Sequence, residues 1–176
     1  MLGTELTRWT IRLALLFLAA RLAGELRWRG ESWWYKWSRG IWTAGCIFFV
    51  LHVICAFRFT HHWSHADALR VTGDRTAEML GVRFGEGLYF SYLFLLLWLV
   101  DVAWQWLSPA GYRQRSPWLT TGFLAYMAFI AFNGAVIFEH GVTRWFGIPI
   151  SLALVVSAAV IATRSRRLTA TAPSHR

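Results

Sequence analysis

Three apolar runs constrain this chain more than any other feature of its sequence. They cover residues 41–59, 88–107 and 118–138. As helices, each is long enough to span about 30 Å of hydrocarbon. Of the 176 residues 56% are apolar and only 15% charged, a composition unlike that of a water-soluble domain. The sequence therefore predicts an all-α fold, a multi-pass transmembrane helical bundle.

Two less regular runs extend the prediction to five spans. Residues 146–162 precede a cluster of arginines that is typical of a cytoplasmic stop. Residues 9–28 are also long enough, and the side chains of Arg12 and Arg21 can reach the two interfaces. The alternative is four spans with an N-terminal helix lying in the interface. Residues 1–163 then form a single bundle with an outer loop over 60–87, and residues 164–176 form a basic disordered tail.

Lys and Arg divide unevenly between the two sets of loops. Residues 21–40 carry five, residues 108–117 two and the residues after 162 four, whereas the other side carries seven. Cytoplasmic loops are enriched in these residues. We therefore expect a protein of the bacterial cytoplasmic (inner) membrane with a cytoplasmic C-terminus. The net charge of +9 needs no nucleic acid partner, since no nucleic-acid-binding motif accompanies it.

The tryptophans cluster near the predicted ends of the spans, where indoles prefer to lie. We interpret most of the twelve as interfacial anchors and not as a ligand cage. Those at the cytoplasmic ends are Trp33, Trp34, Trp37, Trp42, Trp104, Trp106 and Trp118.

A histidine cluster follows the second predicted span. If that helix continues, His61 and His65 share a face and His62 lies close to it, a spacing that lets imidazoles reach one metal ion. Alternatively, Ser64 and Asp67 form a capping pattern that begins a new helix, and the cluster lies at a helix junction.

The fourth predicted span ends at the same outer surface with Glu139 and His140. Together with the three histidines of the cluster they are candidate ligands for Zn, Cu, Fe or Mn. Glu86 is a weaker candidate. The alternative is an interfacial polar rim that binds no ligand.

Four polar side chains lie inside predicted spans: His52, Asp101, Gln105 and Asn133. Such groups are costly in hydrocarbon and usually face the bundle interior. Asp101 and Gln105 share one face at i, i+4, and His52 and Asp101 lie at depths that let them meet with modest tilt. They serve either helix packing or a proton relay. Haem is not expected, because no second imidazole lies at the depth of His52.

The outer loop is amphipathic and predicts one or two short helices, with breaks at Gly73 and Gly81. These helices either cap the histidine cluster or form a docking face for a partner subunit. Cys46 and Cys55 are nine residues apart in one helical run, so they cannot form a disulfide with each other.

Three segments carry a resemblance to known proteins. They are Phe59–Asp67 (FTHHWSHAD), the 87–101 stretch that begins GLY and ends WLVD, and the 131–141 stretch with AFN and EHG. The chain resembles a family of small uncharacterised bacterial integral membrane proteins over residues 41–145. This resemblance implies a location in the membrane and assigns no catalytic residue, cofactor or activity.

Three hypotheses about function follow from these patterns. The first is an accessory or assembly component of a membrane complex, without catalysis of its own, whose partners are the lipid bilayer and a membrane-protein subunit. The second is a metal-binding membrane protein that uses the histidine cluster. The third is a small proton or solute permeation unit that uses His52 and Asp101.

Overall fold

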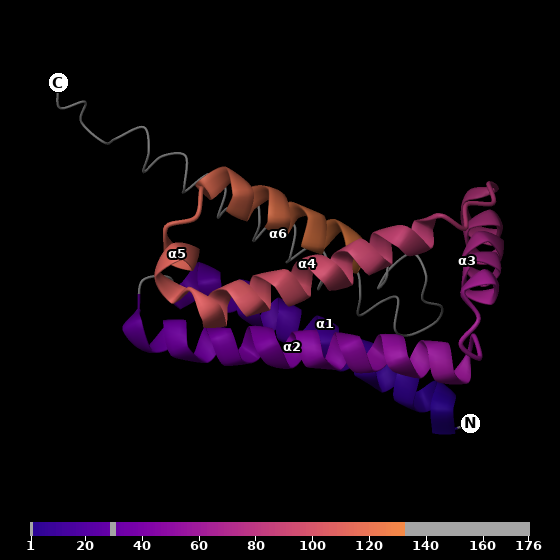
Figure 1. Ribbon diagram of the computed structural model, residues 1–176, viewed down its shortest axis with the longest axis horizontal. Coiled ribbons are helices and arrows are strands. Elements are labelled where there is room, and N and C mark those ends of the chain that lie inside the picture. Colours follow the sequence, from indigo (N-terminus) through magenta and orange to yellow (C-terminus); the bar gives the residue numbers. More distant parts are fainter. Residues whose placement is uncertain (1, 29–30, 133–176) are drawn as a thin grey trace.

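A computed structural model describes residues 2–28 and 31–132, and all regular structure in that part of the chain is helical. These residues form six successive helices, whose arrangement Figure 1 shows. They are α1 (Leu2–Trp28), α2 (Ser32–Phe59), α3 (His65–Leu80), α4 (Gly87–Leu107), α5 (Pro109–Arg113) and α6 (Pro117–Phe132). The predicted span over 146–162, the end of the span over 118–138 and the tail over 164–176 lie outside the described residues.

Two of these helices, α2 and α4, are long and apolar enough to cross a membrane. The apolar runs predicted helices over 41–59 and 88–107, and the helices observed are Ser32–Phe59 and Gly87–Leu107. Hydropathy marks only the apolar part of α2, because its first turns carry polar residues and exposed tryptophans. Of the five predicted spans, two therefore have a helix that is long and apolar enough to cross a membrane. Helix α1 and the described part of α6 do not combine the same length and apolarity.

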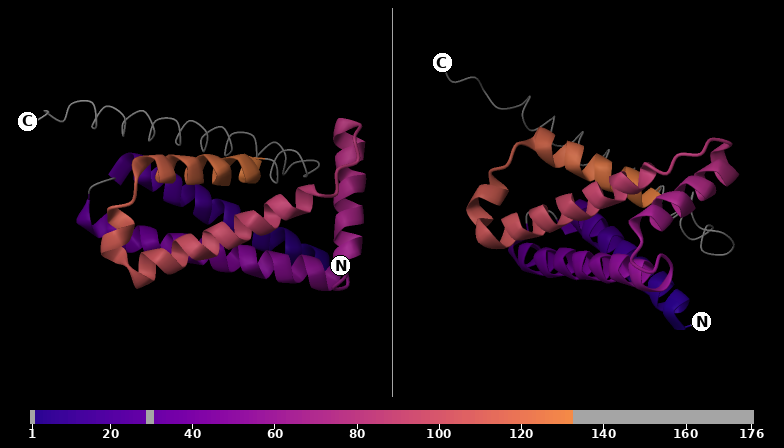
Figure 2. Two further views of the ribbon diagram at one scale, coloured as in Figure 1. Left: turned by 45° about the horizontal axis from the view of Figure 1, so that its top comes forward. Right: turned by 45° about the vertical axis from the view of Figure 1, so that its right-hand side comes forward.

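Helices α1 and α2 pack side by side, and α4 and α6 lie across them (Figure 1). The two ends of this bundle differ. At the α3 end, α2 finishes and α4 begins, and α3 runs across this end of the bundle, as Figure 1 and the left view of Figure 2 show. At the α5 end, α1 finishes, α2 begins and the short α5 connects α4 to α6.

The core of the bundle is largely aromatic. Trp42 and Phe49 of α2 lie against Trp98 of α4, with ring centroids 4.8 and 5.8 Å away, and Phe94 packs edge-on to Trp98 at 5.4 Å. Such pairs contribute about 0.5–1.5 kcal/mol each beyond the area they bury. Small and aliphatic side chains close this core from α1 and α6: Ala14, Leu18, Leu22, Met127, Ala128 and Ala131.

Two glycines allow the close approach of α1 and α2 to their neighbours. A Cβ atom on Gly24 would lie 1.8 Å from the Trp34 ring, and one on Gly45 would lie 2.8 Å from Trp98. Only the absence of a side chain lets these indoles lie directly against the backbone.

The interpretation of the tryptophans as anchors is wrong for two of those named. Trp34 and Trp42 are 5% and 3% exposed, so they are core residues, as is Trp98 of α4, which is 0% exposed. Trp34 lies against α1 and Trp42 against α4, whereas Trp37 and Trp118 are 66% and 68% exposed. Only the outward-facing residues have the exposure that an interfacial anchor needs.

The junction between α2 and α3 is a tight turn with an unusual backbone. His62 and Trp63 both have positive φ angles, 48° and 62°. This conformation costs non-glycine residues on the order of 1 kcal/mol or more each. Two backbone hydrogen bonds hold it: Trp63 N–H donates to Phe57 C=O at 2.8 Å, and Ser64 N–H donates to His61 C=O at 2.8 Å.

Helix α3 begins and ends with recognisable caps. The Ser64 hydroxyl accepts a hydrogen bond from the Asp67 N–H at 3.1 Å, and Gly81 ends the helix with φ 72°. The sequence pattern of Ser64 and Asp67 therefore predicted the start of this helix correctly. Gly73 was expected to be a break and instead lies inside α3, where a Cβ atom would lie 3.3 Å from the Gly85 nitrogen of the returning chain.

Candidate functional site

A buried polar network surrounds Asp101, which lies six residues before the end of α4 and is 5% exposed. Its Oδ2 accepts hydrogen bonds from Trp42 Nε1 at 2.9 Å, Gln105 Nε2 at 3.0 Å and the Tyr112 hydroxyl at 3.0 Å. The donors come from α2, α4 and α5. One carboxylate therefore joins three helices at the α5 end of the bundle.

The fourth donor is an arginine. Arg115 follows α5 and places its Nη1 2.6 Å from Asp101 Oδ1, with only 12% and 6% of the two side chains exposed. Its guanidinium also lies over the Tyr112 ring, 4.0 Å from the centroid. The short α5 begins with Pro109 and turns the chain back, and this reversal brings Arg115 to α4. The charge of Asp101 is thus balanced within the bundle.

Tyr112 and Gln105 close the network. Gln105 Nε2 also donates toward the Tyr112 oxygen at 2.8 Å, and Gln105 lies one helical turn after Asp101. Burial, and then the Asp101 carboxylate, raise the pKa of Tyr112, so its hydroxyl keeps the proton that it donates.

The role of the Asp101 carboxylate follows from the number of hydrogen-bond donors around it. A carboxylate has roughly four lone-pair positions, and Asp101 meets four donors. Oδ2 accepts three of these hydrogen bonds, and Oδ1 accepts the one from Arg115. The network is suited to holding α2, α4 and α5 together.

The sequence pattern predicted only part of this network. Asp101 and Gln105 do share a face that is turned toward other helices. Trp42, Tyr112 and Arg115 were missed, because each is an ordinary residue for the edge of a membrane. The only signal was Arg115 itself, a cation fourteen residues after an acidic residue inside a predicted span.

His52 lies apart from this network. Its Nδ1 is 2.9 Å from the carbonyl oxygen of Thr7 on α1. The residue of α2 that contacts Asp101 is Trp42, ten residues earlier, which corresponds to about 15 Å along the helix. The predicted meeting of His52 and Asp101 is therefore wrong, because the register of α2 against α4 sets Trp42 at that depth. Asn133 lies outside the described residues.

The histidines at the α3 end have separate partners. His61 Nδ1 lies 3.2 Å from Asp67 Oδ2. His65 lies between two tyrosines of α4, with Nδ1 3.0 Å from the Tyr92 oxygen and Nε2 3.5 Å from the Tyr89 oxygen. Because α2 ends at Phe59 and α3 begins at His65, the histidines do not share a helix face.

Asp67 is the centre of a chain of ion pairs along α3. The Arg70 guanidinium, 2.5 Å away, and then His61 lower the pKa of Asp67, and Asp67 in turn raises the pKa of Arg70. Asp74 continues the chain with Arg70 at 3.2 Å and Arg83 at 2.8 Å. These side chains are largely exposed, so they order the surface of α3 and contribute little to stability.

Within residues 2–28 and 31–132, no group of three or more His, Cys, Asp or Glu side chains is close enough to hold a metal ion. His140 and Glu139, the other two proposed ligands, lie outside the described residues. Cys46 and Cys55 are free cysteines and form no disulfide with each other, which agrees with the prediction from their spacing.

Comparison with known proteins adds no assignment. No family model, curated protein or solved structure matches the chain.

Proposed function

We propose that the chain is a multi-pass protein of the bacterial inner membrane that serves as a non-catalytic accessory component of a membrane complex. Two helices that are long and apolar enough to cross a membrane support the insertion. The distribution of Lys and Arg favours the α5 end as the cytoplasmic end, since five basic residues lie in 21–40 and two in 108–117. The α3 end is then the outer end.

One observation carries this proposal: the last residue of α3 and the turn after it expose three large apolar side chains. Leu80, Val82 and Phe84 are 66%, 65% and 44% exposed. They lie outside the two apolar helices, so lipid-facing hydrophobicity of a span does not explain them. Contiguous exposed apolar side chains typically mark a contact surface. We assign this surface, residues 80–84, to a second membrane-protein subunit.

The turn is held in one conformation before any partner arrives. Thr76 Oγ1 donates to the Phe84 carbonyl at 3.3 Å, and Arg83 pairs with Asp74. Gly85 lies so close to α3 that a Cβ atom there would be 2.6 Å from the Leu69 carbonyl oxygen. A surface ordered in this way loses less entropy when it binds, which favours a docking role.

The network of Asp101 supports the non-catalytic part of the proposal, because its four hydrogen bonds all go to side chains of this chain. Asp101 is the only Asp or Glu residue of α2 and α4, and its carboxylate is bound by structural partners such as Arg115. The permeation hypothesis would need His52 and Asp101 to exchange protons, and the two have different partners.

The metal-binding hypothesis stays an alternative that elemental analysis can decide. Purified protein is compared with a His61→Ala, His65→Ala double variant. A stoichiometric transition metal that is lost only in the variant would establish metal binding. Substoichiometric metal in both samples would refute it.

Photo-crosslinking in native membranes tests the docking role. A photoreactive side chain at position 82 should give one adduct of defined mass, which weakens when Leu80 is changed to Ser. The matched control is position 107, where Leu107 is 85% exposed at the opposite end of α4. Adducts that are equal at both positions, or that contain lipid alone, would refute the proposed surface.

Labelling with an impermeant thiol reagent tests the orientation. In a Cys46→Ala, Cys55→Ala background, a cysteine at the exposed position 75 should react from the outside. A cysteine at the exposed position 114 should react only after permeabilisation. The reverse pattern would invert the topology.

A further inference from the structure

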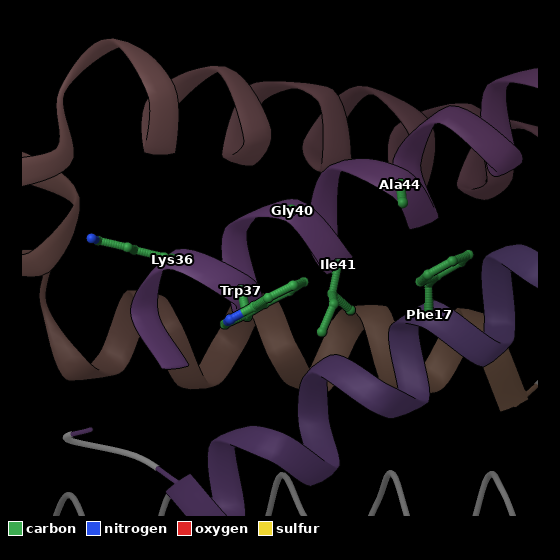
Figure 3. A pocket seen from close by; sticks show the side chains of 6 residues that line it. All are labelled: Phe17, Lys36, Trp37, Gly40, Ile41 and Ala44. Atoms are coloured by element: carbon green, nitrogen blue, oxygen red, sulfur yellow. The ribbon is translucent and has the colours of Figure 1, made fainter. Parts of the chain in front are cut away.

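An apolar groove runs along the face of α2 that points away from the core. Phe17 of α1 and the side chains of Trp37 and Ile41 line it, and its volume is about 500 Å³. Figure 3 shows Lys36 at one end of the groove and Ala44 and Phe17 at the other. This volume lies within the range of about 300–1,000 Å³ that is usual for small-molecule sites.

Small residues create the groove. A Cβ atom on Gly40 would meet nothing within 4 Å, so the space above this residue is open. Ala44 lies one turn further on the same face. Bulky aromatic side chains stand beside these two positions, and Trp37 is 66% exposed.

The groove has the length and polarity of a site for one lipid chain. Lys36 and Ala44 are eight residues apart, or about 12 Å along the helix. One leaflet contains about 15 Å of hydrocarbon. Lys36 is the only lysine in the sequence, and among the described residues it belongs to no ion pair. The groove therefore has a cation at one end and only apolar walls beyond it.

We propose that this groove binds one acyl chain of an anionic glycerophospholipid, whose phosphate contacts the Lys36 ammonium. The inference rests on the proposed membrane insertion, in which the start of α2 lies at the cytoplasmic interface. Exposed Trp37 next to Lys36 suits that depth, because indoles prefer the interface. Basic side chains at this level attract the negatively charged cytoplasmic leaflet.

Charge distinguishes this occupant from a second copy of the chain. Gly40 and Ala44 form a small-xxx-small pattern, which also supports helix pairing. In a twofold symmetric pair of parallel helices that meet at Gly40, the same patch faces itself. Lys36, one turn away, would then be brought toward the Lys36 of the other copy. Repulsion between two ammonium groups opposes this dimer, whereas a phosphate removes the unbalanced charge.

Native mass spectrometry of the full chain in detergent micelles tests the proposal. The probes are phosphatidylglycerol and phosphatidylcholine with identical acyl chains. Lys36→Gln removes the cation and Gly40→Leu fills the groove. The matched controls are Arg27→Gln, a charge removed at an exposed position of the last turn of α1, and Ala103→Leu, a side chain enlarged at an exposed position of α4.

The wild-type chain should retain one phosphatidylglycerol in preference to phosphatidylcholine. Lys36→Gln should lower that preference about fivefold, the factor that corresponds to about 1 kcal/mol for one basic side chain near an anionic surface. Gly40→Leu should lose the retained molecule of either lipid, and both controls should behave as wild type. Circular dichroism checks that the Gly40→Leu variant keeps its helices. If that variant loses helix content, the comparison of Lys36→Gln with Arg27→Gln tests the proposal alone.

Three results would overturn the proposal. Equal retention of both lipids by the wild type would show that the headgroup charge has no role in binding. An equal effect of Arg27→Gln and Lys36→Gln would show a diffuse surface charge. A dimer that Gly40→Leu dissociates would identify a second copy as the occupant. Alkaline carbonate extraction separates this inference from the proposed function, because release of the wild-type chain from membranes would refute insertion itself.

Discussion

Replacing Asp101 by Asn should destabilise the protein by about 3 kcal/mol. The substitution keeps the shape of the side chain and an oxygen that can accept hydrogen bonds from Trp42, Gln105 and Tyr112. It removes the negative charge that faces Arg115 at 2.6 Å. The guanidinium then remains buried without a counter-ion.

The magnitude follows from the burial of the pair. Side-chain exposures of 12% and 6% place Arg115 and Asp101 among buried ion pairs, for which removal of one partner costs about 3–5 kcal/mol. Neutral hydrogen bonds inside a membrane protein contribute much less, about 0.6 kcal/mol on average. We therefore expect the charge to account for most of the loss.

Denaturation with sodium dodecyl sulfate, followed by circular dichroism in mixed micelles, measures the change. Arg115→Gln should cost about as much as Asp101→Asn, and the double variant should cost less than the sum of the two by about 2 kcal/mol. The control is Arg8→Gln, whose pair with Glu5 is 54% and 56% exposed and should contribute less than about 1 kcal/mol. Additive costs below about 0.5 kcal/mol for the two single variants would refute the reasoning.

Three further predictions concern other parts of the chain. Gly24→Ala should destabilise the pairing of α1 and α2, since its Cβ would lie 1.8 Å from Trp34, and a Gly24→Ala, Trp34→Ala double variant should recover part of the loss in the same denaturation assay. Ser64→Ala should raise hydrogen exchange in the first turn of α3 by about fivefold, because it removes an N-cap worth about 1 kcal/mol; unchanged exchange would show that the cap is not needed. The contacts of Asp67 lower its pKa from 3.8, so its stabilisation of α3 should be complete above about pH 5 and disappear as the pH falls through the lowered value. Hydrogen exchange of α3 against pH measures this, and Asp67→Asn should abolish the dependence.

The sequence predicted most of the helices because their signals are local. Apolar length located α2 and α4, and the pair of Ser64 and Asp67 located the start of α3. Gly73 was misinterpreted because its role depends on Gly85, which approaches it only after the chain has turned back. A glycine that relieves a tertiary contact carries the same local signal as one that breaks a helix.

The candidate site was harder to predict for the same reason. Asp101 and Gln105 stand out as polar residues in an apolar run, so their importance was visible. Their partners Trp42 and Arg115 are 59 and 14 residues away in the chain, and both are residue types expected at any membrane interface. The register between α2 and α4 places Trp42, and not His52, beside Asp101. This register depends on the packing of the aromatic core and leaves no periodic signal in the sequence.

The pairing of Asp101 with Arg115 has a consequence for synthesis. An aspartate within a transmembrane helix costs about 2.5–3.5 kcal/mol at the bilayer centre when the insertion machinery releases it to lipid. The arginine that offsets this cost is fourteen residues later. At about 5–20 residues per second, the ribosome needs about one to three seconds to supply it. In the proposed membrane insertion, α4 therefore gains from remaining beside the translocon during that interval, so its release is expected to follow the emergence of α5.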